Sequence, residues 1–511
     1  MSNDVENSKR IAKNAMLLYM RTAIVMLVTL YTSRVVLGVL GVEDYGLYNV
    51  VGGVVAMFSV LSGSFSTAIS RFITFELGKK DQERLRLVFS TSINALVLLV
   101  VIVLLLLETV GIWFLEEKLV VPEERLNAAR WVYQFSVLTF AINLWSVPYN
   151  ASVIAHERMA VFAYISLFDA GVKLLISYMI MRSPFDSLIY YALLLLLNGL
   201  LVRCLYSIYC KRHFEECRYQ FRFDKKLFKE MLRFSGWNFL GASSDVFRDQ
   251  GGNVLLNLFF GPAVNAARAV SMQVGMAVLA FVNNFMAAFR PQIIKNYADG
   301  NHEYMLQLIY RSSKFSFFIF WLMALPVLVT TQSLLHLWLG SEPAHSVNFV
   351  RLILLYVMHE MISAPMITAM LATGNIRNYQ IVVGGIQLLN LPISYICLFW
   401  GAPSEAVFIV AVSLSFIALF FRVYMLRKMI GLSFRKFYMG IYFRIVMVIV
   451  VSSIIPFALK YNLSHDFAVF LLLCFVSFIC SLLSIYVLGC TREERSIVSN
   501  GIIEIVSRIR G

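Results

Sequence analysis

Long apolar segments constrain the fold of this chain more than any other feature. A helix needs about 20 mostly apolar residues to cross a bilayer, and the sequence holds about 14 such stretches. Backbone groups in lipid must be hydrogen-bonded within the protein, so these stretches are predicted to be helices. The ten-residue alternation typical of a membrane β-barrel is absent from the sequence. The predicted spans are 16–40, 46–69, 87–107, 129–152, 160–181, 187–209, 234–260, 265–288, 309–332, 347–370, 380–400, 405–426, 439–459 and 467–489.

The composition agrees with that prediction and excludes the soluble classes of protein. Hydrophobic residues make up 59% and charged residues 14% of the 511 residues, against about 45–50% and 25% in a soluble domain. So little charge cannot cover the roughly three soluble domains that this length would otherwise suggest. The seven cysteines lie in predicted helices or inner segments, so neither a disulfide framework nor a metal site is predicted. The predicted fold class is an all-α polytopic membrane protein.

Lysine and arginine are unevenly distributed between the predicted loops, and this sets the orientation. With a cytoplasmic amino terminus, the two largest basic clusters, 71–86 and 211–233, fall on the cytoplasmic side. The net charge of +14 is then mainly a topology signal, and a nucleic-acid partner is not predicted. No small-residue cleavage site follows the first apolar run, so that run is predicted to be a retained span. Both termini are predicted to be cytoplasmic.

The two halves of the sequence resemble each other at a nearly constant spacing. Gly41 recurs as Gly261, 220 residues later, and Pro148 recurs as Pro365, 217 residues later. Each half holds six predicted spans, so the repeats share one orientation, as in transporters whose repeats are related by an axis along the membrane normal. The predicted domains are an N-lobe at 1–209, a basic linker at 210–233, a C-lobe at 234–426, two further helices at 427–489 and an interfacial amphipathic tail at 490–511.

Basic residues outnumber acidic ones within the predicted spans, and a charge at the centre of a span is costly unless it faces a cavity or a partner. Arg203, Lys314, Arg422 and Arg444 lie near the ends of their spans, and snorkelling to the interface is expected to explain them. The excess of positive charge favours an anionic substrate, and arginine suits phosphate especially well. The predicted acids within spans are Asp169, Asp245, Asp249 and Glu360.

The span 234–260 has one small, polar face. At 100° per residue the residues of this face fall on one stripe, which predicts that the helix lines a water-filled cavity. The alternative is local neutralisation, in which Arg248 pairs with an acid one turn away. The two interpretations are compatible, because an ion pair can open in one state. The stripe consists of Asn238, Gly241, Ala242, Asp245, Arg248, Asp249 and Gly252.

Two arginines of the first predicted span cannot both face one narrow groove. Arg21 and Arg34 are 13 residues apart, which places them about 140° apart around the helix. Arg21 shares a face with Thr32, and we favour Arg21 for the cavity. Arg268 opens the eighth span and is a further candidate for binding the substrate.

Two other charged groups have open interpretations. Asp169 and Lys173 are four residues apart on the fifth span, so they either neutralise each other or contribute to substrate binding. Glu360 has no evident local partner, so it is a candidate proton or cation site, with packing against an arginine as the alternative. No cofactor is predicted, and the coupling species suggested by these acids is H⁺ or Na⁺.

Several of these features together resemble a known group of transporters. The 14 spans, the six-plus-six repeat, the segment Gly41-Val-Glu-Asp-Tyr-Gly-Leu-Tyr48 and Ser70-Arg71-Phe72 are similar to those of the bacterial polysaccharide (O-antigen) flippases. These belong to the multidrug/oligosaccharidyl-lipid/polysaccharide exporter superfamily. The resemblance implies a two-lobe transporter of the bacterial inner membrane. It would move undecaprenyl-diphosphate-linked oligosaccharides by alternating access, in contact with membrane lipids and with the polysaccharide polymerase machinery as a further partner.

The same resemblance implies positions for the substrate. In related flippases of lipid-linked peptidoglycan precursors, arginines on helices 1, 2 and 8 engage the diphosphate, and helices 13 and 14 form a groove for the lipid tail. Arg21 or Arg34, together with Arg268, are the positional matches in this chain.

Two other functions remain open from the sequence. A cation-coupled multidrug exporter of the same superfamily would favour acidic or neutral cavities. The acidic residues Asp245, Asp249 and Glu360 are consistent with that alternative. An enzyme acting on lipid-linked sugars would need catalytic groups on substantial outer loops. The longest outer loop, near 108–128, carries acids that are expected to be solvated: Glu116, Glu117, Glu123 and Glu124. Catalytic residues and catalytic activity are therefore not predicted.

Overall fold

The computed structural model describes residues 2–79, 81–156, 158–340, 342–373, 377–462 and 467–496, and every regular element in these ranges is helical. The chain is therefore an all-α polytopic membrane protein. The first half contains α1 (Ser2–Ala56), α2 (Ser59–Lys79), α3 (Gln82–Leu106), η1 (Leu107–Gly111), α4 (Ile112–Glu117), η2 (Glu123–Arg125), α5 (Leu126–Ala155), α6 (Met159–Met179), η3 (Ile180–Arg182), α7 (Ser187–His213) and η4 (Glu215–Cys217). The second half contains α8 (Lys225–Phe260), α9 (Pro262–Ala298), α10 (His302–Val329), α11 (Thr331–Leu339), α12 (Ser346–Ala372), α13 (Arg377–Tyr379), η5 (Gln380–Gly384), α14 (Gly385–Leu388), α15 (Asn390–Phe399), α16 (Ala406–Ile430), α17 (Phe434–Phe437), η6 (Tyr438–Tyr442), α18 (Phe443–Asn462), α19 (Phe467–Ser484) and η7 (Ile485–Gly489).

The helices reproduce the predicted membrane spans. Within the described residues, 12 helices are long and apolar enough to cross a bilayer, and each matches one predicted span. The two remaining predicted spans also fall on helices. The span 46–69 covers the end of α1 and the first half of α2, and the span 234–260 lies within α8.

The chain divides into two compact units. Unit 1 comprises Met1–Ala269 and Leu388–Val407, and unit 2 comprises Val270–Gln387 and Phe408–Gly511. Unit 1 thus contains α8, the start of α9 and α15 in addition to the first six predicted spans. Compact units and sequence repeats are different divisions of the chain, so the predicted lobes remain a prediction.

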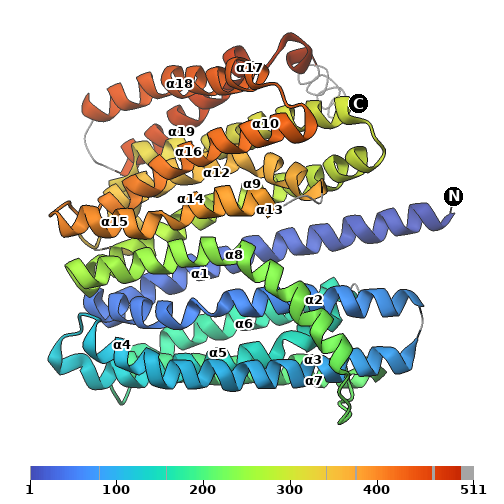
Figure 1. The fold of residues 1–511 in the computed structure, drawn as a ribbon. Coiled ribbons are helices and arrows are strands. Elements are labelled where there is room, and N and C mark those ends of the chain that lie inside the picture. The colour runs from blue at the N-terminus through green and yellow to red at the C-terminus, as the bar shows by residue number, and fades with distance from the viewer. Residues whose placement is uncertain are drawn as a thin grey trace, which may run out of the picture. The chain divides into compact units, whose positions relative to one another are not determined.

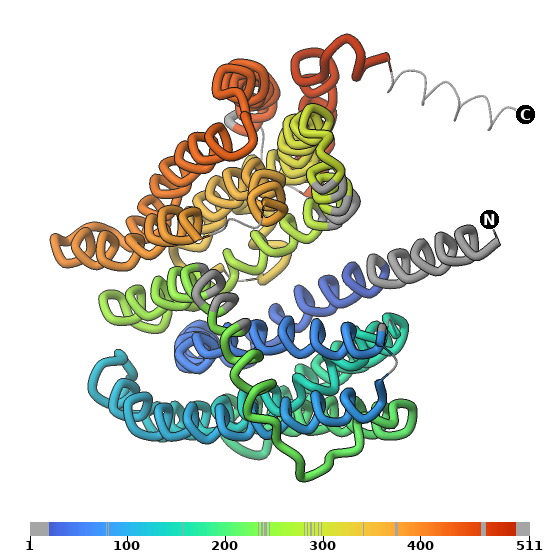
Figure 2. Tube along the Cα trace, turned by 45° about the vertical axis from the view of Figure 1, so that its right-hand side comes forward, coloured from blue at the N-terminus to red at the C-terminus, as the bar shows by residue number. Residues whose placement is uncertain are grey.

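Unit 1 is a helical bundle in which α5 is central. Helix α5 packs against α7, α2, α1 and α3, and α1 also packs along α6. Helix α8 contacts α2 and α1 and carries α15 against it. Figure 1 shows α2, α3, α5 and α7 side by side in blue and green, and Figure 2 gives the same bundle from a second side.

Unit 2 is built around α10. This helix packs against α12, α18 and α19, and the two last helices pack against each other. Its core is strongly aromatic: Phe317 stacks on Trp321 with ring centroids 5.8 Å apart, and the indole nitrogen of Trp321 donates to Ser452 Oγ on α18. A buried indole needs such an acceptor, and this bond therefore fixes α18 against α10.

Two single glycines connect helices without any loop residues. Gly41 has φ 77° and ψ 173° inside the span of α1, and Gly261 has φ 80° and ψ −179° between α8 and α9. Both lie in a region of backbone conformation that side chains strongly disfavour. The two glycines that define the 220-residue spacing in the sequence therefore share one unusual geometry.

Gly46 and the paired prolines extend this similarity. A Cβ atom on Gly46 would lie 1.8 Å from the carbonyl oxygen of Pro262, so only glycine allows α1 to approach the first turn of α9 this closely. Pro148 and Pro365 are both buried inside helices, and each lies seven residues before its helix ends, at Ala155 and Ala372. A proline removes one helical hydrogen bond, and it does so at the same place in both repeats.

An ionic clamp ties three segments at one end of unit 1. Arg125 of η2 donates from Nε to Asp44 Oδ1 at 2.8 Å, and its terminal nitrogens bind Asp186. Asp186 also caps α7 by accepting from the amides of Leu188 and Ile189. Burial acts to raise the pKa of Asp186, but these hydrogen bonds outweigh it, so the pKa lies below its ordinary value.

Unit 2 contains a buried ion pair that the sequence did not indicate. Lys314 Nζ donates to Glu494 Oε1 at 2.8 Å, with side chains only 5% and 9% exposed. The expectation that Lys314 snorkels is therefore wrong, because its ammonium group finds an acceptor inside the protein. Glu494 lies in the segment 490–511 that was predicted as an interfacial tail, and residues 497–511 of that segment lie outside the described residues.

Candidate functional site

A polar cavity of about 560 Å³ lies within unit 1, among α1, α5, α6, α7 and the first residue of α2. Its lining contains hydroxyl, amide and charged side chains in the middle of membrane-spanning helices. Polar groups are costly in that environment unless they face water or a ligand. The position of this cavity therefore makes it the candidate functional site.

Helical periodicity explains how these side chains reach one space. Residues that are three, four or seven positions apart share a face of a helix. The polar lining residues follow this spacing on two helices, with Ser136, Thr139 and Asn143 on α5 and Ser166, Asp169 and Lys173 on α6.

Asp169 is the acceptor for two side chains in the cavity. Lys173 Nζ donates to its Oδ2 at 2.7 Å, and Asn198 Nδ2 of α7 donates to its Oδ1 at 2.6 Å. The pair remains partly open, since the Lys173 and Asp169 side chains are 49% and 29% exposed. This is the mutual neutralisation that the sequence suggested, and it occurs in the wall of the cavity. A role of the pair in binding substrate stays a prediction.

Arg21 brings a second cation to the same cavity. Its guanidinium carbon lies 4.8 Å from the centroid of the Phe162 ring. Its Nε atom is buried and has no hydrogen-bond partner among the described residues. Arg21 and Lys173 against Asp169 leave one net positive charge in the lining. Such a site suits an anion with several acceptor oxygens.

A second basic cluster lies on α8 and α9. Arg248 Nε donates to Asp249 Oδ1 at 3.0 Å, and Arg268 Nη2 donates to the backbone carbonyl of Asp249. The side chain of Arg248 is 11% exposed, and Arg268 as a residue is 9% exposed. The local neutralisation of Arg248 that the sequence allowed is thus present. The side chain of Asp245, predicted on the same stripe, lies outside the described part of the chain.

The remaining predicted site residues lie apart from the cavity. Arg34 is exposed on α1 and does not belong to the lining. Glu360, on α12 in unit 2, accepts from Arg422 Nη1 at 3.3 Å, and Arg422 Nε also donates to Tyr379. This is the packing alternative for Glu360, while ion coupling there stays a prediction. Arg422 is 2% exposed, so the expectation that it snorkels is wrong.

Sequence reasoning missed Asn198, Asn143 and the hydroxyls of α5. Charged residues stand out in an apolar segment, whereas these asparagine and hydroxyl side chains carry no charge. The spacing 136, 139 and 143 was a usable signal, because three polar residues on one face of an apolar helix predict a polar neighbour. Among the residues that the structure describes, no group of three or more His, Cys, Asp or Glu side chains could hold a metal ion.

The chain matches one family model and one curated relative. A family model described as "Polysaccharide biosynthesis protein" matches residues 11–297, more than half of the chain. The uncharacterized membrane protein EpsK of Bacillus subtilis (strain 168) is 21% identical over 310 residues, which are 59% of this chain. That match spans 60% of the length of EpsK.

Two solved structures are similar in fold. The lipid II flippase MurJ in an inward closed conformation has a TM-score of 0.71 at 11% identity, covering 92% of this chain and 98% of that one. An inward-facing multidrug resistance MATE family transporter of the MOP superfamily has a TM-score of 0.69 at 15% identity, covering 82% and 98%. At such identities the similarity concerns the fold.

Proposed function

Because the chain belongs to the polysaccharide biosynthesis protein family, we propose that it moves a lipid-linked oligosaccharide from one leaflet of the membrane to the other. The observation that carries the proposal is the positively charged polar cavity among membrane-spanning helices of unit 1. The fold it shares with a lipid II flippase supports the same class of substrate.

The diphosphate of the substrate would bind the cations of the cavity. Arg21 offers an N–H group without a partner, and Lys173 can turn from Asp169 toward an incoming phosphate. The hydroxyl and amide groups of α5 and α7 would contact the sugars, which need many hydrogen bonds. This division of labour requires no bond to be made or broken, so we propose a transporter and not an enzyme.

Alternating access between two lobes would expose the cavity first to one leaflet and then to the other. The proposed setting is the bacterial inner membrane with both termini cytoplasmic, in keeping with the basic inner segments. Coupling to H⁺ or Na⁺ at Asp169, Asp245, Asp249 or Glu360 belongs to the same proposal. Collapse of each gradient in turn during transport would identify the ion.

A flipping assay in proteoliposomes tests the proposal. With a polyprenyl-diphosphate oligosaccharide as substrate, Arg21→Ala and Lys173→Ala should each slow flipping about tenfold or more, since a hydrogen bond to a charged group is worth about 1.5–3 kcal/mol. Arg158→Ala is the matched control, because Arg158 is an exposed arginine of the same unit outside the cavity. Full-rate flipping by both cavity variants would refute the electrostatic account.

The multidrug exporter remains the second candidate. It requires a carboxylate that can exchange its cation for a drug or a coupling ion, and Asp169 lies in the cavity. Lys173 already supplies that carboxylate with a cation at 2.7 Å, which favours the flippase. Efflux of a cationic dye that depends on Asp169 would decide for the exporter.

A further inference from the structure

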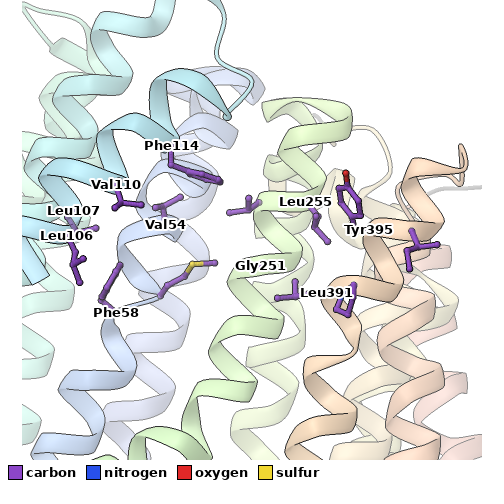
Figure 3. A pocket seen from close by; sticks show the side chains of 15 residues that line it. Val54, Phe58, Leu106, Leu107, Val110, Phe114, Gly251, Leu255, Leu391 and Tyr395 are labelled. Atoms are coloured by element: carbon purple, nitrogen blue, oxygen red, sulfur yellow. The ribbon is translucent and has the colours of Figure 1, made fainter.

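A second cavity of about 760 Å³ lies in unit 1 and has an almost entirely apolar lining. One wall comes from the junction of α1 and α2 with α3, η1 and α4, and the other comes from α8 and α15. Figure 3 shows Phe58, Leu107 and Val110 on the first wall, facing Leu255 and Leu391 on the second. The volume is in the range of small-molecule binding sites, roughly 300–1,000 Å³.

The wall formed by α8 and α15 is closely packed. A Cβ atom on Gly251 would lie 2.4 Å from Leu391 Cδ2, so the absence of a side chain lets α15 seat directly on α8. In the opposite wall, a Cβ atom on Gly111 would lie 1.9 Å from the hydroxyl oxygen of Tyr133. Each wall is therefore closely packed at these glycines, and the space between the walls remains open.

The rim of this cavity is exposed. Val110 is 57% exposed on one wall, and Tyr395 and Ile396 are 48% and 46% exposed on the other. The cavity is therefore open at its rim. Exposed apolar side chains on membrane-spanning helices suit contact with lipid chains, so we expect hydrocarbon to have access to the cavity.

Hydrocarbon is also the filling that the lining favours. Water in an apolar cavity would lack the two to four polar partners that a buried water needs. A hydrocarbon chain gains from each methylene that it buries against the walls.

The apolar cavity and the polar cavity share the segment 52–59, in which α1 ends and a turn at Met57 and Phe58 leads into α2. Val54, Met57 and Phe58 line the apolar cavity, whereas Gly52, Val55 and Ser59 line the polar one. Sites suited to a charged head and to an apolar chain thus adjoin the same short stretch of backbone.

We propose that the apolar cavity binds the isoprenoid chain of the lipid-linked substrate. This inference rests on the proposed function. It places the chain at α1, α3, α8 and α15, and not at the two last spans, α18 and α19, that the resemblance implies for the lipid tail. A lipid with one chain and one multiply charged head matches one apolar cavity next to one cationic cavity. A phospholipid has two chains, and one of them would remain outside.

Photo-crosslinking of the full chain in nanodiscs tests this site. The probe is a polyprenyl diphosphate with a diazirine in its chain, and adducts are mapped by mass spectrometry of the peptides that contain 106–114 and 391–396. Val110→Trp should reduce labelling of the second peptide about tenfold, because the indole occupies the volume of several methylenes. Ile396→Trp fills the same cavity from the other wall and should do the same to the first peptide.

Val101→Trp is the matched control, since Val101 lies on α3 nine residues before Val110 and is 49% exposed but does not line the cavity. Its labelling should equal that of the unmodified protein. A phospholipid with a diazirine in one acyl chain should label these peptides weakly and should be displaced by polyprenyl diphosphate. Equal phospholipid labelling without displacement, or prenyl adducts confined to other helices, would overturn the inference.

The outcomes separate this inference from the proposed function. If prenyl adducts form only on other helices while flipping still depends on Arg21, the chain site is overturned but the proposed flippase function still stands. If prenyl adducts form in the apolar cavity but the rate of flipping is unchanged in Arg21→Ala and Lys173→Ala, the chain site is supported and the electrostatic account is refuted.

Discussion

Lys173 in unit 1 has different surroundings from Lys314 and Arg422 in unit 2. In unit 1, Lys173 is 49% exposed in the wall of a polar cavity. In unit 2, the side chains of Lys314 and Arg422 are 5% and 3% exposed, and each is bonded to a glutamate. Each of these cations has a carboxylate partner, so pairing alone does not distinguish a working charge from a structural one. We expect access to a cavity to make that distinction.

The comparison predicts the largest loss of stability at Lys314. Lys314→Met leaves Glu494 buried without its cation, and removing one partner of a buried pair costs about 3–5 kcal/mol. Thermal unfolding of the protein in detergent, followed by tryptophan fluorescence, measures the effect.

A double variant sharpens this prediction. Lys314→Met with Glu494→Gln removes both charges and should recover most of the lost stability. If the double variant is as unstable as the single one, packing around Lys314 and not the ion pair is responsible.

Arg422→Leu should have the second largest effect. Glu360 is 21% exposed and loses its hydrogen bond from Arg422, so the expected cost is about 2–3 kcal/mol. The same unfolding measurement applies, and flipping by the protein that remains folded should be unchanged. A loss of flipping without a loss of stability would instead favour Glu360 as an ion-coupling site.

The clamp of Arg125 predicts a smaller, acid-dependent effect. The pKa of Asp186 is lowered in the folded chain, so its contribution is complete above the unfolded value of about 3.9 and is lost as pH falls below it. Asp186→Asn keeps the helix cap and should cost about 1–2 kcal/mol at pH 7.

The pH series checks that sign. Between pH 6 and pH 3 the unfolding temperature of the unmodified protein should fall more than that of Asp186→Asn. Parallel curves would show that Asp186 does not contribute through its charge.

The smallest effect on stability is expected at Lys173. A half-exposed pair contributes less than about 1 kcal/mol, so Lys173→Met should unfold within a few degrees of the unmodified protein while flipping fails. A large destabilisation would place Lys173 with Lys314 as a structural residue, and the comparison between the units would lose its basis.

The fold was largely readable from the sequence, because the bilayer imposes both the length and the apolarity of each span. The 220-residue spacing paired Gly41 with Gly261, but their shared backbone geometry appeared only in the structure. The partners of Lys314 and Arg422 were not readable. Glu494 lies 180 residues from Lys314, and Arg422 lies 62 residues from Glu360, and nothing in local spacing joins them.

The candidate site was readable only in part for a related reason. Arg21, Asp169 and Lys173 stood out because charge is rare in a span. Asn198 and the second, apolar cavity did not, because apolar residues that line a cavity have the same composition as those that face lipid. Only the tertiary arrangement distinguishes the two.

The single-residue connections at Gly41 and Gly261 have a mechanical consequence. A loop of several residues would absorb a tilt of one helix before its neighbour responded. One glycine leaves only its own φ and ψ for such a tilt, so we expect most of the rotation of one helix to reach the next. Lengthening either connection by inserted glycines should therefore leave a protein that folds and binds its lipid but no longer transfers motion along the chain.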